Sequence, residues 1–149
     1  MEARTTDILD RLPHRPPFRF VTDALELDGN DEARAIWRVT GDESMLEGHF
    51  PGAPMVPGVL IGEALAQLSG LIVAAREPEV DRAAPARAGK LAHMNLRFPA
   101  TVVPPADIAL KSKLERVFGS LWQFEAEASW KGTTVARGSL ALAMSEETA

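Results

Sequence analysis

One stretch of this sequence, from Val59 to Ala75, is apolar on nearly every side and constrains the fold more than any other feature. Its only polar side chains are Glu63, Gln67 and Ser69. A helix that is apolar nearly all round has to be buried on most of its surface. Pro57 suits the first helical position, because its ring fixes φ and it has no N–H to leave unpaired. We therefore expect a long, buried central helix.

Glu63 is the unusual residue of this helix. A buried carboxylate is costly unless it is paired, hydrogen-bonded or protonated. Desolvation favours the protonated form of a carboxyl group, which can then act as a general acid. Glu63 could equally well form a hydrogen bond to Gln67, one turn further on, and serve only to fix the packing of the helix. Taken alone, Glu63 favours that structural interpretation.

His49 changes the balance. It lies in a segment that is interrupted by glycine or proline at positions 48, 51, 52, 54 and 57, so neither a helix nor a strand can run through it. An imidazole on such a loop can accept a proton near neutral pH. The backbone N–H groups at the start of the helix, around Gly58, could polarise a carbonyl oxygen. A base, an acid and an oxyanion donor are thus present in one segment.

The same segment carries a family resemblance. Residues 48–67, GHFPGAPMVPGVLIGEALAQ, closely resemble the signature of the β-hydroxyacyl-acyl carrier protein dehydratases, which reads GHFPG, then P, then PGV, then E-A-x-A-Q. Upstream, residues 12–18, LPHRPPF, are similar to the family pattern LPHRxPF. With a weaker match near the C-terminus, the resemblance spans nearly the whole chain.

The resemblance implies the hot-dog fold, an antiparallel sheet wrapped around a long central helix. It also implies a homodimer whose two sheets join edge to edge, and often a trimer of dimers. Pairing across a two-fold axis is physically reasonable, since an unpaired strand edge is a liability.

The order of elements agrees with an α+β arrangement. Alternating polar and apolar residues predict strands, and Gly-containing turns separate most of them. We expect a short helix within residues 1–11 and an exposed loop at 76–89. The expected strands are 20–27, 33–40, 91–98, 107–116, 121–130 and 134–144.

By resemblance, the active site forms between two protomers, with His49 of one facing Glu63 of the other. The implied reaction is dehydration of a 3-hydroxyacyl thioester on acyl carrier protein to a trans-2-enoyl thioester. In this mechanism the Gly58 amide binds the thioester carbonyl, His49 removes the C2 proton and Glu63 protonates the departing C3 hydroxyl. We expect no metal and no organic cofactor, because the thioester already acidifies the α-proton.

Other residues of the signature receive supporting roles. Gln67 is expected to orient Glu63 or to line the pocket, and Pro57 to support the site at the start of the helix. The candidates for the wall of an acyl tunnel are Phe50, Met55, Val56 and Val59. Ordinary core packing would explain each of them equally well.

The resemblance would allow a functional role for His14, in the upstream motif, but we favour a structural role. A histidine flanked by Pro13 and Arg15 often locks a loop through hydrogen bonds. The chain also departs from the family where Met45 and Leu46 replace an aromatic pair, and in residues 102–107, where VVPPAD has an extra residue and no glycine. The chain has no tyrosine, so a tyrosine gate of the tunnel is missing.

Composition sets the outer bounds. The 149 residues, 46% of them hydrophobic, suffice for one domain over residues 1–149. Cysteine is absent, which excludes disulfides and is compatible with a reducing cytoplasm, where we expect the protein to act. A net charge of −5 gives no footprint for nucleic acid. Glu63 and Gln67 argue against a membrane span, and three scattered histidines argue against zinc.

Two alternatives remain open. In a hot-dog acyl thioesterase the helix carboxylate would activate water or attack the thioester, which explains Glu63 but leaves His49 without a role. A non-catalytic acyl- or carrier-binding subunit would keep the pocket without turnover. The presence of both His49 and Glu63 argues against a binding subunit, which has no use for an acid opposite a base.

Overall fold

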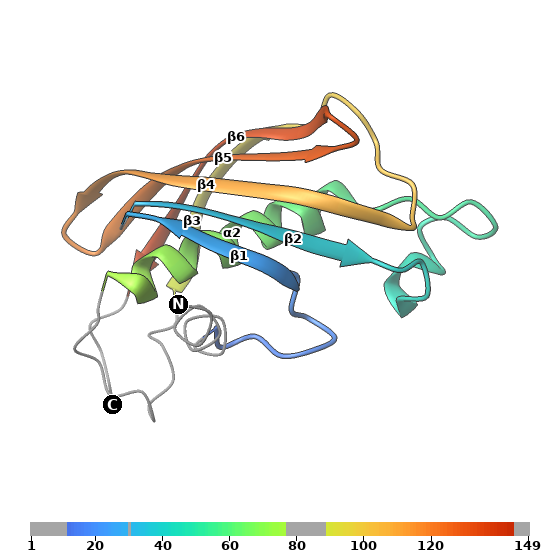
Figure 1. Ribbon diagram of the computed structural model, residues 1–149, viewed down its shortest axis with the longest axis horizontal. Helices are drawn as coiled ribbons and strands as arrows, with labels where there is room; N and C mark the ends of the chain where they lie inside the picture. The colour runs from blue at the N-terminus through green and yellow to red at the C-terminus, as the bar shows by residue number, and fades with distance from the viewer. Residues whose placement is uncertain (1–11, 30, 77–88, 145–149) are drawn as a thin grey trace.

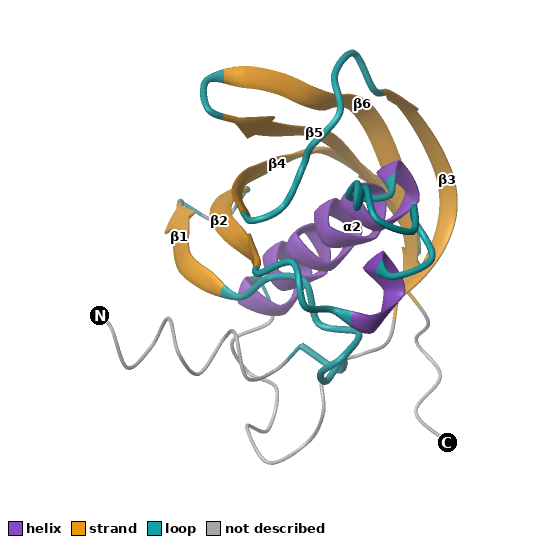
Figure 2. Cartoon of the chain, turned by 90° about the vertical axis from the view of Figure 1, so that its right-hand side faces the viewer, coloured by secondary structure: helices purple, strands orange, loops and turns teal. Residues whose placement is uncertain are grey.

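The structure, a computed structural model, describes residues 12–29, 31–76 and 89–144. In this part of the chain six antiparallel strands form one sheet in the order β1-β2-β4-β5-β6-β3. The sheet curls around helix α2 (Figures 1 and 2). The elements are β1 (Asp23–Asp28), β2 (Glu32–Val39), the 3-10 helix η1 (Ser44–Leu46), α2 (Gly58–Ala75), β3 (Gly89–Arg97), β4 (Ala106–Phe118), β5 (Leu121–Trp130) and β6 (Thr133–Met144).

The expected α+β class and the hot-dog arrangement are confirmed. β5 has the bounds expected from the sequence, and the other strands differ by a few residues at one or both ends. The largest difference is at β1, which begins at Asp23 and not at residue 20, because the Phe20 amide bonds to a side chain of α2. The short helix expected within residues 1–11 and most of the loop expected at 76–89 lie outside the described residues.

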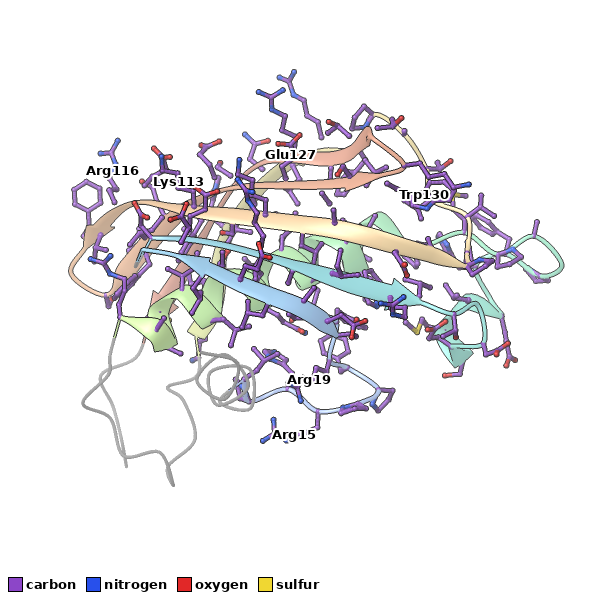
Figure 3. The ribbon with its side chains drawn as sticks, in the orientation of Figure 1. Arg15, Arg19, Lys113, Arg116, Glu127 and Trp130 are labelled. Carbon is purple, nitrogen blue, oxygen red and sulfur yellow. The ribbon has the colours of Figure 1, made fainter. Side chains whose placement is uncertain are left out.

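The sheet separates an inner from an outer face. On β4 the inward residues Ile108, Leu110 and Ser112 are buried, while the intervening Ala109 and Lys111 are exposed, as the period of two in a strand requires. Figure 3 shows the labelled Lys113 and Glu127 on the outer face, away from α2. The inner face is therefore the one that can hold a site.

Helix α2 is buried along most of its length, as expected. Pro57 lies at the N-cap with φ −64° and ψ 133°, so the expectation that it occupies the first helical position is wrong by one residue. Ser69 anchors the helix to the sheet, because its hydroxyl lies 2.7 Å from that of Ser112 and both residues are fully buried. Ser69 also donates to the Leu65 carbonyl at 2.8 Å, so the pair is satisfied.

The start of α2 packs closely against β3. A Cβ atom on Gly62 would lie 2.8 Å from Sδ of Met94, and one on Gly58 would lie 3.2 Å from the ring of Phe98. A larger residue at either glycine would require the Met94 side chain or the Phe98 ring to shift. The two glycines thus allow close packing of the start of α2 against this part of the sheet.

Gly138 on β6 is required by a similar constraint. A Cβ atom there would lie 2.0 Å from the backbone oxygen of Asn95 on β3. We expect Gly138→Ala to lower the free energy of unfolding by about 3 kcal/mol or more, since backbone has to move. Gly119→Ala is the control, because its φ is also positive but nothing lies within 4 Å of the added atom; we expect a loss of about 1 kcal/mol. Chemical denaturation measures both, and equal losses would contradict the explanation.

Candidate active site

Gln67 organises the polar part of α2. Its side chain is 2% exposed, and its Oε1 accepts a hydrogen bond from the Phe20 amide at 2.8 Å. Its Nε2 donates to the Phe18 carbonyl at 3.0 Å and to Oε2 of Glu63 at 3.1 Å. One amide group therefore binds the segment before β1 to the helix and holds the carboxyl group of Glu63 at the same time.

Glu63 is less buried than the sequence predicts. Its side chain is 25% exposed, and Nε2 of His14 lies 3.4 Å from its Oε2. The carboxyl group is therefore held on one side by the protein and is open on the other. Such a group can meet a substrate, which a fully enclosed carboxylate cannot.

His14 does not lock its loop, contrary to the expectation from the sequence. Arg15, labelled in Figure 3, does so, because its guanidinium donates to the carbonyl oxygens of Leu12 and His14. The imidazole of His14 is directed at Glu63 instead. The sequence around His14 could not predict its contact with Glu63, because the two residues are 49 positions apart.

A cavity of about 70 Å³ adjoins this group. Its polar end contains Glu63, Gln67 and His14. The rest is mainly apolar and lies between α2, the start of β3 and the end of β6. The apolar lining includes Ala66, Gly70 and Ala74 on α2 and Leu91, Leu142 and Met144 on the strands.

His49 is held at some remove from this cavity, on the loop between η1 and α2. Its Nδ1 lies 2.8 Å from the carbonyl oxygen of Met55, and the Met55 amide donates back to the His49 carbonyl at 2.7 Å. Because a carbonyl only accepts, Nδ1 carries the hydrogen and Nε2 of the neutral ring keeps its lone pair. The ring also stacks on Phe50, with centroids 4.4 Å apart. The loop thus presents a fixed imidazole with a basic Nε2.

Within one chain the two expected catalytic groups do not meet. His49 is not among the residues that line the cavity of Glu63, and no hydrogen bond or ion pair joins them within the described residues. The four expected tunnel residues do not line that cavity either. Phe50 and Val59 are 51% and 76% exposed, Met55 is half-buried, and Val56 is buried in the core.

The start of α2 has the expected free amide. The first hydrogen bonds of the helix are made by Leu60 and Ile61, both to the Pro57 carbonyl, and within the described residues the Gly58 amide has no partner. A Cβ atom at position 58 would lie 3.2 Å from the ring of Phe98, so a larger residue there would require the ring to shift.

The loop that leads to His49 is closed by Glu43. Its Oε2 accepts from the amide and hydroxyl of Thr40 at 3.0 and 3.2 Å, and its Oε1 accepts from the Gly41 amide at 2.9 Å. Burial raises the pKa of the Glu43 carboxyl, but these hydrogen bonds lower the pKa by more, so it lies below its usual range. The carboxylate therefore stabilises the loop above the usual pKa of a glutamate, and this contribution is lost as the pH falls through the lowered pKa.

Among the described residues, no group of three His, Asp or Glu side chains is placed to hold a metal ion. Helix α2 has the length and hydropathy of a membrane span, but 67% of that window is buried within the protein. We therefore interpret α2 as the core helix of this fold.

The fold and the signature loop together define a hot-dog protein with an ionisable group on its central helix. The family model described as a FabA-like domain matches residues 12–139. The chain belongs to this family, as the resemblance of the signature indicates.

Two curated relatives share one name. The chain is 38% identical over 142 residues to the 3-hydroxyacyl-[acyl-carrier-protein] dehydratase FabZ of Herpetosiphon aurantiacus, covering 93% of this chain and 95% of the relative. It is 36% identical to the protein of the same name from Rhizobium etli, covering 93% of this chain and 86% of the relative. The similarity is therefore nearly end to end.

Solved structures agree on the fold. The dehydratase heterocomplex ApeI:P from Xenorhabdus doucetiae aligns with a TM-score of 0.76 at 20% identity, over 93% of this chain and 91% of that one. A hypothetical thioesterase from Streptococcus pneumoniae, solved with coenzyme A, aligns with a TM-score of 0.67 at 11% identity, over 97% and 99%. At these identities the likeness concerns the fold alone.

The role of Gln67 can be measured through stability. Gln67→Met keeps the volume but leaves the Phe20 amide and the Phe18 carbonyl without partners, so we expect a loss of about 2 to 3 kcal/mol in unfolding free energy. Gln123→Met, on a half-buried residue of β5 without such bonds among the described residues, should cost less than about 1 kcal/mol. Chemical denaturation compares the two. A Gln67 variant as stable as the control would show that these bonds contribute little.

Proposed function

We propose that the protein dehydrates 3-hydroxyacyl thioesters carried by acyl carrier protein to trans-2-enoyl thioesters in fatty-acid biosynthesis, in the cytoplasm. Family membership and the curated relatives support the reaction class. The observation that carries the chemistry is the hydrogen bond from Nδ1 of His49 to the Met55 carbonyl, which leaves Nε2 free to accept a proton. Glu63 supplies a positioned carboxyl group at the end of an apolar cavity.

The steps follow from these groups. The Gly58 amide donates to the thioester carbonyl and stabilises the negative charge that develops there. Nε2 of His49 takes the proton from C2, the C2–C3 double bond forms, and the C3–O bond breaks as Glu63 gives its proton to the leaving hydroxyl. Water and the enoyl thioester leave, with His49 protonated and Glu63 ionised. A proton then passes from one to the other through solvent, which restores both groups.

The site would be completed by a second copy of the chain. Base and acid do not meet within one chain, and β3 is an edge strand with almost all its residues exposed. Exposed apolar side chains lie on the loop before α2, at the start of α2, on β3 and on the segment after β3; they are Phe50, Val59, Leu91, Phe98 and Val103. A second copy of the chain would cover them. Such an edge and such a surface favour a homodimer. Assembly of dimers into a hexamer is the further arrangement that the family resemblance implies.

Shared sites can be tested by complementation. We expect His49→Ala and Glu63→Ala each to lower kcat at least about 1000-fold, since each removes a group that transfers a proton. In mixed dimers of the two variants, one site lacks both groups and the other has both. Co-refolding equal amounts should therefore restore about a quarter of the wild-type activity. No recovery, despite mixed dimers detected by affinity tags, would contradict a site built from two chains.

The product identifies the reaction. Purified protein with 3-hydroxyacyl-carrier substrate should give enoyl absorbance without free thiol. Release of thiol would indicate the thioesterase alternative, in which Glu63 acts and His49 does not. Neither signal, with the substrate bound, would indicate a non-catalytic acyl-binding subunit.

The acyl chain is expected to follow the apolar part of the cavity along α2. From Glu63 to Ala74 the helix rises about 16 Å, and both Ala66 and Gly70 leave space on that side. Nothing lies within 4 Å of a Cβ atom built on Gly70, so a larger residue would project into free volume. This path is now our first candidate for the acyl tunnel, in place of the tunnel wall that we inferred from the sequence.

Gly70→Leu should therefore shorten the usable path. We expect kcat/KM for a long substrate of about twelve carbons to fall at least about 10-fold, and that for one of about four carbons to change less than about 2-fold. Gly70→Ala, with one small added group, is the matched control and should behave as the wild type. Equal losses at all chain lengths would mean that the acyl chain lies elsewhere.

A further inference from the structure

His14 is the one titratable group of the site that the proposed mechanism does not use. Its Nε2 lies 3.4 Å from Oε2 of Glu63, and its side chain is 33% exposed. Its other ring nitrogen, Nδ1, is buried and has no hydrogen-bond partner within the described residues. The segment that carries it is fixed to α2 on one side by the bonds of Gln67 to Phe18 and Phe20. The ring is therefore held in place, and the contact with Glu63 is not that of a free surface side chain.

The buried Nδ1 decides which form of the ring is present. A hydrogen on Nδ1 would be a buried donor without an acceptor, which is costly, whereas a lone pair there costs less. Of the two neutral tautomers, the one with its hydrogen on Nε2 is therefore favoured. That nitrogen is the one 3.4 Å from Oε2 of Glu63, so an N–H group faces the carboxyl oxygen.

Oε2 of Glu63 faces two N–H groups: it accepts a hydrogen bond from Nε2 of Gln67 at 3.1 Å, and Nε2 of His14 lies 3.4 Å away. Within the described residues Oε1 accepts no hydrogen bond. In the protonated carboxyl group the oxygen that faces the two N–H groups is the carbonyl oxygen, and the hydrogen resides on the other one. The two N–H groups thereby direct the acidic hydrogen to Oε1, on the side that the protein leaves open.

We infer that His14 is a positioning residue for the general acid: with Gln67 it fixes Oε2 of Glu63, so that Oε1 presents the proton to the departing C3 hydroxyl. This rests on the proposed dehydratase function, in which Glu63 is the acid. His14 itself exchanges no proton with the substrate. The role differs from the loop-locking role expected from the sequence, which Arg15 performs.

The test compares a residue that keeps the donor with one that lacks it. In His14→Gln the side-chain amide can place an N–H near the position of Nε2, whereas His14→Leu fills similar space without a donor. Loss of the N–H group that faces Oε2 predicts a fall in kcat of about 10- to 100-fold for His14→Leu, with KM within about 3-fold of the wild type. His14→Gln should keep kcat within about 3-fold. Equal losses in both variants, or none in His14→Leu, would overturn the inference.

A second comparison separates action through Glu63 from a general effect on the site. In a Glu63→Gln background the residual turnover should change less than about 2-fold when His14→Leu is added, because the partner of His14 has already lost its acidic function. A further fall as large as in the wild-type background would show that His14 acts independently of Glu63. Thermal melting of each variant identifies any that fails to fold.

A measurement on the unaltered protein does not depend on the folding of any variant. Nitrogen-15 NMR of histidine-labelled protein reports which ring nitrogen carries the hydrogen, and the His14→Gln spectrum assigns the signals. The inference predicts a neutral His14 with hydrogen on Nε2, and a hydrogen on Nδ1 would overturn it. If the wild type instead forms no enoyl product, the proposed function fails, whatever the form of His14. If it does and the His14 results are negative, only this inference fails.

Discussion

The buried amide of Gln67 is the contact on which the arrangement of the site depends. Burial holds an apolar helix inside a curved sheet, but burial does not fix which helix side chains face the segment before β1. The three hydrogen bonds of Gln67 do so, because they join α2 to the backbone at Phe18 and Phe20 and to Glu63. The carboxyl group and the segment that carries His14 are thereby placed together. A residue that could only pack would leave two backbone groups unsatisfied.

The proposed acid, Glu63, and the proposed base, His49, belong to two differently built halves of the site. The acid side rests on a helix within the sheet and on the segment before β1. The base side is a loop closed on itself by the two hydrogen bonds between His49 and Met55. Neither half reaches the other within the chain, while the exposed edge of β3 and the apolar residues around it lie unpaired. Folding prepares each half, and assembly would bring the halves of two chains together.

Much of this could be predicted from the sequence, because the signals are local or periodic. The apolar run from Val59 to Ala75 predicts the core helix. The alternation of polar and apolar residues, with a short turn on each side, predicts both ends of β5. The start of β1 could not be predicted, since the Phe20 amide bonds to a side chain 47 residues away. The exposure of Val59 was missed for a related reason, because an apolar residue looks the same in sequence whether it faces its own core or a second chain. The contact of His14 with Glu63 is equally long-range.

We propose that Glu63 and His49 act on one substrate from two chains. A crystal structure of the assembled protein with a non-reactive 3-hydroxyacyl amide in place of the thioester would test this arrangement. We expect Glu63 of one subunit within about 3 Å of the hydroxyl oxygen and Nε2 of His49 of the other subunit directed at C2. A ligand that meets only one of the two groups, or both from the same chain, would contradict it.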